Sequence, residues 1–168
     1  MSHRVVSLDP GGTTGYAIAY IGEPKRLLLS YKQHAWSESE LWDALELLKP
    51  DSLICESFEY RQNSRAGLDL TPAHLIGVVK LYGDKHDCRL FFQTAAKGKG
   101  YYTDSALKNA LVFNSHFRHG RDAVRHLLTW FTFGAGYKYN DLDAKDKFAF
   151  QMLDEQNLLD SYFDRVVL

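Results

Sequence analysis

Three acidic residues that are far apart in the sequence each stand where a regular element begins or ends. Asp9 follows a short β-branched run and precedes Pro-Gly-Gly-Thr-Thr-Gly, Glu56 follows the apolar run 52–55, and Asp122 lies near the start of a predicted helix. In α/β folds such positions gather at one edge of the sheet. Carboxylates are the ligands that Mg²⁺ and Mn²⁺ prefer. The pattern predicts a divalent-metal site, where two ions roughly 3.5–4 Å apart can support phosphodiester hydrolysis.

Each of these acids also has an ordinary structural explanation. An Asp-Pro-Gly-Gly turn needs no function in a hairpin, and a carboxylate at a strand end is satisfied by a salt bridge to Arg or Lys. Asp122 would also suit the first turn of a helix, where acids are favoured. Glu59 follows Glu56 by three residues, is expected in a loop, and ranks below it as a candidate.

The segment HGRDAVRH at 119–126 is predicted to be part of an amphipathic helix. At about 100° per residue its apolar side chains share one face, and His119, Asp122 and His126 form a stripe beside that face. The helix would bury its apolar face on the sheet and direct an imidazole and a carboxylate at the rim. His119 is a candidate metal ligand or acid/base. For His126 the pattern leaves a buried structural role and a ligand role equally open.

The elements that must position these residues are read from periodicity and from cap and turn signals. Ser37 and Glu40 form a predicted capping box for a helix that ends before Pro50, and a basic loop broken by glycines is expected after the last strand. The order predicts a mixed sheet, with three antiparallel strands followed by parallel ones, and helices on its faces. The predicted strands are 4–8, 14–20, 26–33, 52–55 and 88–93, and the predicted helices are 37–49, 72–85, 103–112, 119–131 and 143–159.

Composition and charge narrow the class of protein. The chain has 168 residues, 45% of them hydrophobic, which suffices for one globular domain with a core. We expect this domain over 1–136, with a helical acidic tail over 137–168 packed on it or extending it. No apolar run approaches the roughly 20 residues of a membrane span. The two cysteines, Cys55 and Cys88, show neither CxxC spacing nor a disulfide framework, so a reducing cytoplasm without membrane attachment is expected.

The distribution of charge bears on nucleic-acid binding. The formal net charge of −1 argues mildly against it, because phosphate binding needs Lys and Arg. However, the segment from Lys97 to His126 contains six Lys or Arg residues and two acids. The segment from Asp141 to Leu168 contains seven acids and three Lys or Arg residues. A basic working region with an acidic tail fits these numbers, as does an ordinary solvated mixture of charges.

Four segments in order resemble the motifs of RuvC-type Holliday-junction resolvases, in particular their phage-encoded branch. They are VVSLDPGGTTGYAIAY, LICESFEYR, AAKGKGYYTDSALK and HGRDAVRHLL, and the resemblance spans residues 4–131. It implies a ribonuclease H-like fold with a mixed five-stranded sheet flanked by helices. It implies that Asp9, Glu56, His119 and Asp122 are catalytic and bind two Mg²⁺ ions, with Mn²⁺ able to substitute. It also implies a homodimer that cuts a four-way DNA junction symmetrically, in the host cytoplasm if the protein is phage-encoded.

The same resemblance suggests residues that contact DNA. A basic residue after the last strand is expected to approach the scissile phosphate, and the pattern does not choose between Lys97 and Lys99. An aromatic loop after Glu56 would enter the junction centre with Phe58 and Tyr60, although local packing explains these two equally well. Its spacing departs from the bacterial pattern, so the preferred branched substrate and sequence stay open. Arg61 and Arg121 complete the expected DNA contacts.

The sequence therefore predicts a Mg²⁺-dependent, structure-selective endonuclease that acts on Holliday junctions and other branched DNA. Two other classes of function fit some of the motifs. Asp-x-Gly-Gly-Thr resembles the first phosphate loop of sugar kinases and actin-like ATPases, but those proteins need two such domains and 168 residues are too few. A non-catalytic protein that binds branched DNA would show junction affinity without cleavage in either Mg²⁺ or Mn²⁺.

Overall fold

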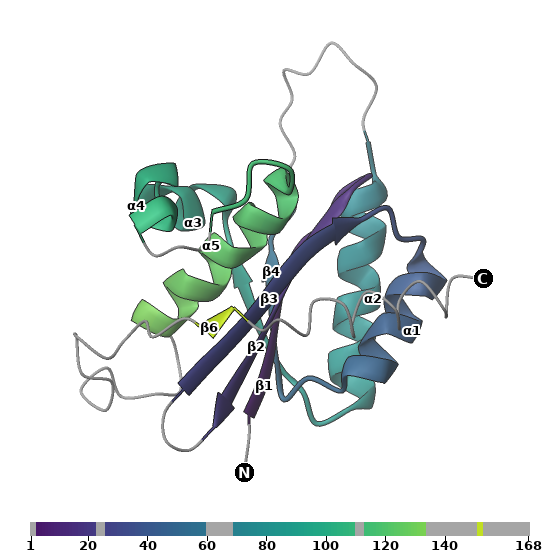
Figure 1. The fold of residues 1–168 in the computed structure, drawn as a ribbon. Helices are drawn as coiled ribbons and strands as arrows, with labels where there is room; N and C mark the ends of the chain where they lie inside the picture. The colour runs from purple at the N-terminus through teal and green to yellow at the C-terminus, as the bar shows by residue number, and fades with distance from the viewer. Residues whose placement is uncertain (1–2, 23–25, 60–68, 110–112, 134–150, 153–168) are drawn as a thin grey trace.

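A mixed six-stranded sheet forms the centre of the computed structural model, which describes residues 3–22, 26–59, 69–109, 113–133 and 151–152 (Figure 1). The strand order is β5-β4-β1-β2-β3-β6. Antiparallel pairing joins β1, β2 and β3, and parallel pairing joins β1 to β4 and β4 to β5. The strands are β1 (His3–Asp9), β2 (Thr14–Gly22), β3 (Arg26–His34), β4 (Ser52–Glu56), β5 (Arg89–Gln93) and β6 (Gln151–Met152). The predicted five-stranded mixed sheet is confirmed, and β6 adds a short edge strand.

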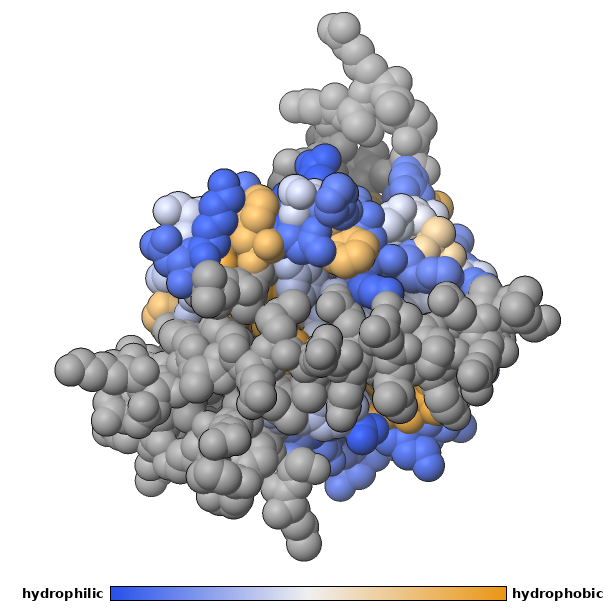
Figure 2. Space-filling view, viewed as in Figure 1, coloured by the Kyte–Doolittle hydropathy of each residue, from blue (hydrophilic) through white to orange (hydrophobic). Residues whose placement is uncertain are grey.

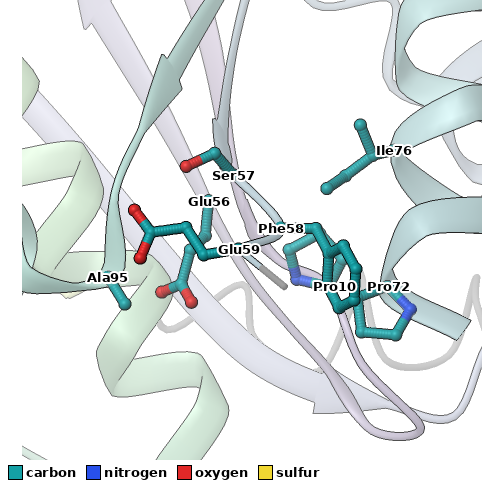
Figure 3. A pocket seen from close by; sticks show the side chains of 8 residues that line it. All are labelled: Pro10, Glu56, Ser57, Phe58, Glu59, Pro72, Ile76 and Ala95. Atoms are coloured by element: carbon teal, nitrogen blue, oxygen red, sulfur yellow. The ribbon is translucent and has the colours of Figure 1, made fainter. Parts of the chain in front are cut away.

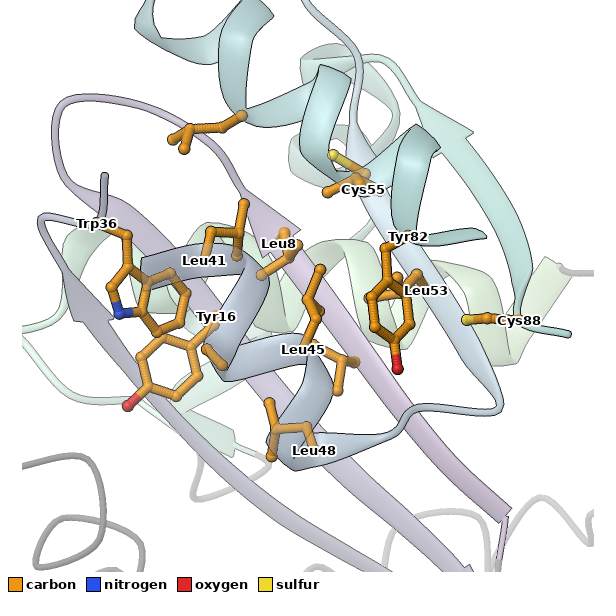
Figure 4. Packing of buried hydrophobic residues seen from close by; sticks show 14 of the residues in the cluster. Leu8, Tyr16, Trp36, Leu41, Leu45, Leu48, Leu53, Cys55, Tyr82 and Cys88 are labelled. Atoms are coloured by element: carbon orange, nitrogen blue, oxygen red, sulfur yellow. The ribbon is translucent and has the colours of Figure 1, made fainter. Parts of the chain in front are cut away.

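Helices cover both faces of this sheet (Figure 1). On one face lie α1 (Glu38–Leu48) and α2 (Thr71–Lys85), and on the other lie α3 (Ala95–Tyr101), α4 (Asp104–Asn109) and α5 (Arg118–Phe133). Each face has its own hydrophobic cluster. Figure 4 shows the first, in which Leu41 and Leu45 of α1 lie close to Leu8 of the sheet, and Leu48 and Leu53 belong to the same cluster. Each such buried side chain stabilises the fold by about 1.5–3 kcal/mol.

The capping box predicted for α1 is present. The Ser37 hydroxyl accepts from the backbone N–H of Glu40, and the Glu40 carboxylate accepts from the backbone N–H of Ser37 at 2.7 Å. Lys49 ends the helix in the left-handed region at φ 44°, directly before Pro50. Start and stop signals in the sequence therefore fix both ends of this helix.

The amphipathic helix predicted over 119–131 is α5. Its apolar face is fully buried and packs on β1, β2, β3 and β4. The side chains on that face are Ala123, Val124, Leu127 and Leu128. Because this face is fixed on the sheet, the orientation of the polar stripe beside it is fixed as well.

Two segments differ from the prediction. The expected basic loop after β5 is the helix α3. Ala95 and Ala96 favour helix, and Gly98 has no side chain where the helix packs closely on α5. The helix predicted over 143–159 is wrong at Gln151 and Met152, which pair in parallel with Leu28 and Leu29 at the edge of the sheet. The rest of 137–168, and the end of the helix expected over 103–112, lie outside the described residues.

The visible surface is mainly polar. On the face shown in Figure 2, the described residues present mostly hydrophilic side chains, with small separate hydrophobic patches among them. Among the described helices, none combines the length and the apolar composition that crossing a bilayer requires.

Candidate active site

Asp9 and Glu56 lie at the carboxyl ends of two adjacent parallel strands. The register pairs Leu8 of β1 with Cys55 of β4, so the acid that follows each of these residues emerges at the same edge of the sheet. Asp9 is buried, with 8% of its surface exposed, and the side chain of Glu56 is 20% exposed. This edge, which the carboxyl ends of parallel strands form, is the usual place for a site in an α/β sheet.

The start of α5 is brought to this edge by two close backbone contacts. A Cβ added to Gly15 of β2 would lie 1.9 Å from the carbonyl oxygen of His119, and one added to Gly120 would lie 2.7 Å from the carbonyl oxygen of Lys32. Only glycine permits an approach this close. The backbone N–H of His119 also donates to Oε1 of Gln33 at 3.0 Å. The helix terminus is thereby fixed directly on β2 and β3.

This position brings the imidazole of His119 to Asp9. His119 Nδ1 lies 2.9 Å from Asp9 Oδ2, and the histidine side chain is 40% exposed. Burial is the largest cause that raises the pKa of Asp9 to about 6, and the charges of Glu56 and Asp122 act in the same direction, while the hydrogen bond with His119 lowers the pKa. The carboxylates of Glu56 and Asp122 are therefore each near enough to repel that of Asp9.

Asp122 is the most strongly paired of the three acids. Its side chain is 8% exposed, and its Oδ2 lies 3.3 Å from Nζ of Lys99 on α3. Its Oδ1 accepts from Arg125, whose guanidinium also pairs with Asp104 of α4 and donates through Nε to the carbonyl of Tyr102 at 2.7 Å. Two cations thus compensate a carboxylate that burial would otherwise make costly.

The structure distinguishes the two lysines that the sequence left open. Lys99 is half-exposed and forms an ion pair with Asp122, one of the three acids of the site. Lys97 is exposed and forms no ion pair with another described residue. Within the described residues, no three His, Cys, Asp or Glu side chains converge as tightly as the ligands of one bound metal ion.

His126 and Gln93 form a second layer behind Glu56. His126 is fully buried on α5, and its Nε2 lies 2.8 Å from Glu56 Oε2. Its Nδ1 lies 3.0 Å from Oε1 of Gln93, the residue that the register pairs with Glu56. Gln93 and Arg125 were not predicted as site residues. The sequence offers one signal for Gln93, because it is a polar residue that ends an apolar strand, as Glu56 does.

A pocket of about 200 Å³ opens beside Glu56 (Figure 3). Glu56 and Glu59 direct their carboxylates to one side of it, and Phe58 lies on the side of Pro10 and Pro72. Phe58 is 36% exposed. The pocket is smaller than the roughly 300–1,000 Å³ typical of small-molecule sites. Tyr60 and Arg61, the other expected DNA contacts in this segment, lie outside the described residues.

Arg121 is engaged within the protein. Its side chain is 13% exposed, donates to the carbonyls of Asn114 and Ser115 at 2.7 and 3.1 Å, and lies 4.7 Å from the ring centre of Phe113. The DNA-binding role expected for Arg121 stays a prediction, and these contacts favour a structural role for it.

The strand order, the antiparallel meander, the parallel pairs and the flanking helices are the features of a ribonuclease H-like fold. Among solved structures, Thermus thermophilus RuvC in complex with a Holliday junction substrate matches with a TM-score of 0.55 and 17% identity, over 75% of this chain and 91% of that one. A structure of Thermus thermophilus RuvC matches with a TM-score of 0.54 and 15% identity, over 75% and 92%. The chain therefore has the RuvC-type ribonuclease H-like fold, as its motifs predict.

Other comparisons add less. The yeast mitochondrial Holliday junction resolvase Ydc2 aligns over 88% of this chain and 73% of its own, with 14% identity and a TM-score of 0.44. No protein-family model and no curated protein sequence matches this chain.

Proposed function

We propose that this protein is a structure-selective DNA endonuclease that cleaves Holliday junctions and other branched DNA with the help of divalent cations. The proposal rests on the concentration of Asp9, Glu56 and Asp122 at one edge of the sheet, where the last two raise the pKa of the first. A divalent cation relieves such repulsion between buried carboxylates. The fold shared with a RuvC bound to a Holliday junction supports branched DNA as the substrate.

The donor set fits Mg²⁺ or Mn²⁺. It consists of carboxylate oxygens and one imidazole, whereas zinc sites in proteins commonly include thiolates or several imidazoles. In this proposal Asp9, Glu56, His119 and Asp122 hold two ions. When bound, such ions stabilise negative charge on the scissile phosphate and lower the pKa of water.

The residues of the chain have separable roles in this proposal. Asp9 accepts a hydrogen bond from His119 Nδ1, which fixes the imidazole and leaves its Nε2 for a cation or a proton. Lys99 brings a half-exposed ammonium group to the same edge, where it is suited to a phosphate. Phe58 offers an exposed ring for stacking on an unpaired base. Two copies of the chain act as a homodimer, each cutting one strand.

The test is cleavage of a labelled mobile four-way junction, compared with duplex, Y-fork and single-stranded DNA, with and without Mg²⁺ or Mn²⁺. We expect metal-dependent cutting of the branched substrates, and loss of cutting with retained junction binding in Asp9→Asn, Glu56→Gln and Asp122→Asn. The exposed acid Asp43 of α1 offers a matched control, Asp43→Asn, which should cut like the wild type. If one of the three site variants cuts at the wild-type rate, the role of that residue is wrong.

One observation favours a second candidate, a non-catalytic protein that binds branched DNA. Asp122 already pairs with Lys99 and Arg125, which would suffice as a structural role for it. This alternative requires junction affinity that does not change with Mg²⁺, together with no cleavage in Mg²⁺ or Mn²⁺. A nucleotide-binding protein like actin or the sugar kinases would instead turn over ATP without DNA.

A further inference from the structure

The imidazole of His126 is held on three sides inside the protein. The residue is fully buried one helical turn after Asp122, and its Nδ1 faces Gln93 Oε1 at 3.0 Å. The orientation of the Gln93 amide follows from its second contact, in which Nε2 donates to the carbonyl of His126 at 3.2 Å. Gln93 therefore accepts from the ring, and the ring cannot rotate without breaking this pair of contacts.

The face of the ring is covered by α3. A Cβ added to Gly98 would lie 3.0 Å from Cε1 and 3.1 Å from Nδ1 of His126, so the backbone of the helix packs directly on the imidazole. Gly98 belongs to the helix that also carries Lys99. The ring is thus held between Gln93 of β5 and Gly98 of α3. These two contacts fix the direction of its remaining edge, which carries Nε2.

That edge meets Glu56. His126 Nε2 lies 2.8 Å from Glu56 Oε2, a normal length for a hydrogen bond. An ordinary core histidine satisfies its nitrogens with backbone groups or water. Here the partner is one of the acids at the candidate metal site, and whichever group carries the shared proton, the contact fixes the carboxylate.

We propose that His126 is a positioning residue, which holds Oε2 of Glu56 so that the other carboxylate oxygen is offered to a divalent cation. The inference rests on the proposed function for its consequence, although the contact itself does not. Hydrogen bonds that orient a metal-binding side chain commonly change metal affinity by about 10–100-fold when they are lost. Gln93 and Gly98 act through His126, by fixing the angle and the plane of its ring.

Two substitutions separate the two edges of the ring. In His126→Gln the side-chain amide reaches the place of Nε2 and can hydrogen-bond to Glu56 as donor or acceptor, whereas in His126→Asn the shorter amide reaches only the place of Nδ1 and Gln93. The readout is binding of Mn²⁺ to the DNA-free protein, followed by electron paramagnetic resonance of free Mn²⁺. We expect His126→Gln to stay within about threefold of the wild-type affinity and His126→Asn to lose about tenfold or more. Equal affinities in the two variants would overturn the proposal.

Glycine substitutions in α3 provide a second test if replacing His126 prevents folding. Gly98→Ala presses on the ring without changing its chemistry, and Gly100→Ala in the same helix meets no atom within 4 Å. We expect weaker Mn²⁺ binding only in Gly98→Ala. Identical Mn²⁺ binding in the two alanine variants would contradict the role of the ring.

A metal-free measurement distinguishes failure of this inference from failure of the nuclease proposal. In a cycle of His126→Asn and Glu56→Gln, the two effects on unfolding by urea should be non-additive, because the residues are in contact. Additive effects overturn the inference whatever the DNA assays show. Non-additive effects in a protein whose wild type binds Mn²⁺ and cuts no branched DNA support the positioning role and reject the nuclease.

Discussion

Nδ1 of His119 lies 2.9 Å from Oδ2 of Asp9, although 110 positions separate the two residues in the chain. The contact joins the start of α5 to the end of β1 and brings the first and last motifs of the sequence together. It does not compensate for the surroundings of Asp9, because burial and the charges of Glu56 and Asp122 still raise the pKa of this carboxyl to about 6. The negative charges of Glu56 and Asp122 therefore still act on Asp9 despite its contact with His119.

The first prediction is that Asp9→Asn stabilises the metal-free protein above about pH 6. The ordinary pKa of this group is 3.8 and the folded value is higher, so the folded state binds the proton more tightly. Its contribution to the free energy of unfolding is full below about pH 4 and is lost as the pH rises through about 6. At pH 7.5 we expect the variant to be more stable by about 1–3 kcal/mol, since one pKa unit corresponds to about 1.36 kcal/mol.

The measurement is urea unfolding with a chelator present, at several pH values from 4 to 8. Asp43→Asn on α1 serves as the control for removing an exposed acid, and it should leave the pH dependence unchanged. A wild type and an Asp9→Asn variant with parallel stability curves over this range would mean that the folded protein does not raise the pKa of Asp9. Added Mn²⁺ should stabilise the wild type and leave Asp9→Asn nearly unaffected.

The second prediction separates the two lysines of α3. Lys99 Nζ lies 3.3 Å from Asp122 Oδ2, whereas Lys97 is exposed and two residues earlier in the same short helix. With saturating junction, we expect Lys99→Ala to slow cleavage by about 100-fold or more, because under the proposed function Lys99 supplies a positive charge to the reacting phosphate. Lys97→Ala should mainly weaken binding. It should also reduce the slope of log affinity against log salt concentration by about 0.9, the value for one phosphate contact.

Single-turnover cleavage and binding at several salt concentrations give the two quantities separately. The matched lysine pair controls for the loss of one positive charge. Equal slowing in the two variants would show that α3 contributes a general basic surface and that the contact of Lys99 with Asp122 has no special role.

The sequence predicts the parts of this site that depend on local pattern. Asp9 and Glu56 follow apolar runs, and the stripe of His119 and Asp122 follows from helical periodicity, so their convergence needs only the topology of the sheet. The contacts of Glu56 with His126, and of His126 with Gln93, depend on the register of β4 and β5 and on how α5 lies across the sheet. Tertiary packing sets both, and no local signal in the sequence encodes them.

The same distinction explains the misassigned helix after β5. Two glycines within seven residues lower helix propensity by about 1 kcal/mol each relative to alanine, so the sequence predicts a loop after this strand. The helix forms because Gly98 fits against the buried ring of His126, a contact between segments 28 residues apart. Likewise, the burial of Arg125, which has 8% of its surface exposed, depends on its pairing with Asp104 of α4 and Asp122, and the helical pattern alone does not predict it.

The third prediction concerns the glycine that admits the start of α5. A Cβ on Gly15 would lie 1.9 Å from the carbonyl oxygen of His119, and backbone atoms cannot yield as a flexible side chain can. We expect Gly15→Ala to destabilise the fold by about 1–3 kcal/mol, as overpacking does. Gly12→Ala in the neighbouring turn meets no atom within 4 Å and should change stability by less than about 0.5 kcal/mol.

The two variants also test whether the position of α5 matters for the proposed reaction. Displacing the helix terminus by about 1 Å would separate His119 from Asp9, and misplacements of this size can cost about 100-fold in rate. Under conditions where Gly15→Ala is still folded by circular dichroism, its cleavage of a four-way junction should therefore fall far below that of Gly12→Ala. Full cleavage by a folded Gly15→Ala protein would show that the close packing of Gly15 on the backbone of His119 is not needed for the reaction.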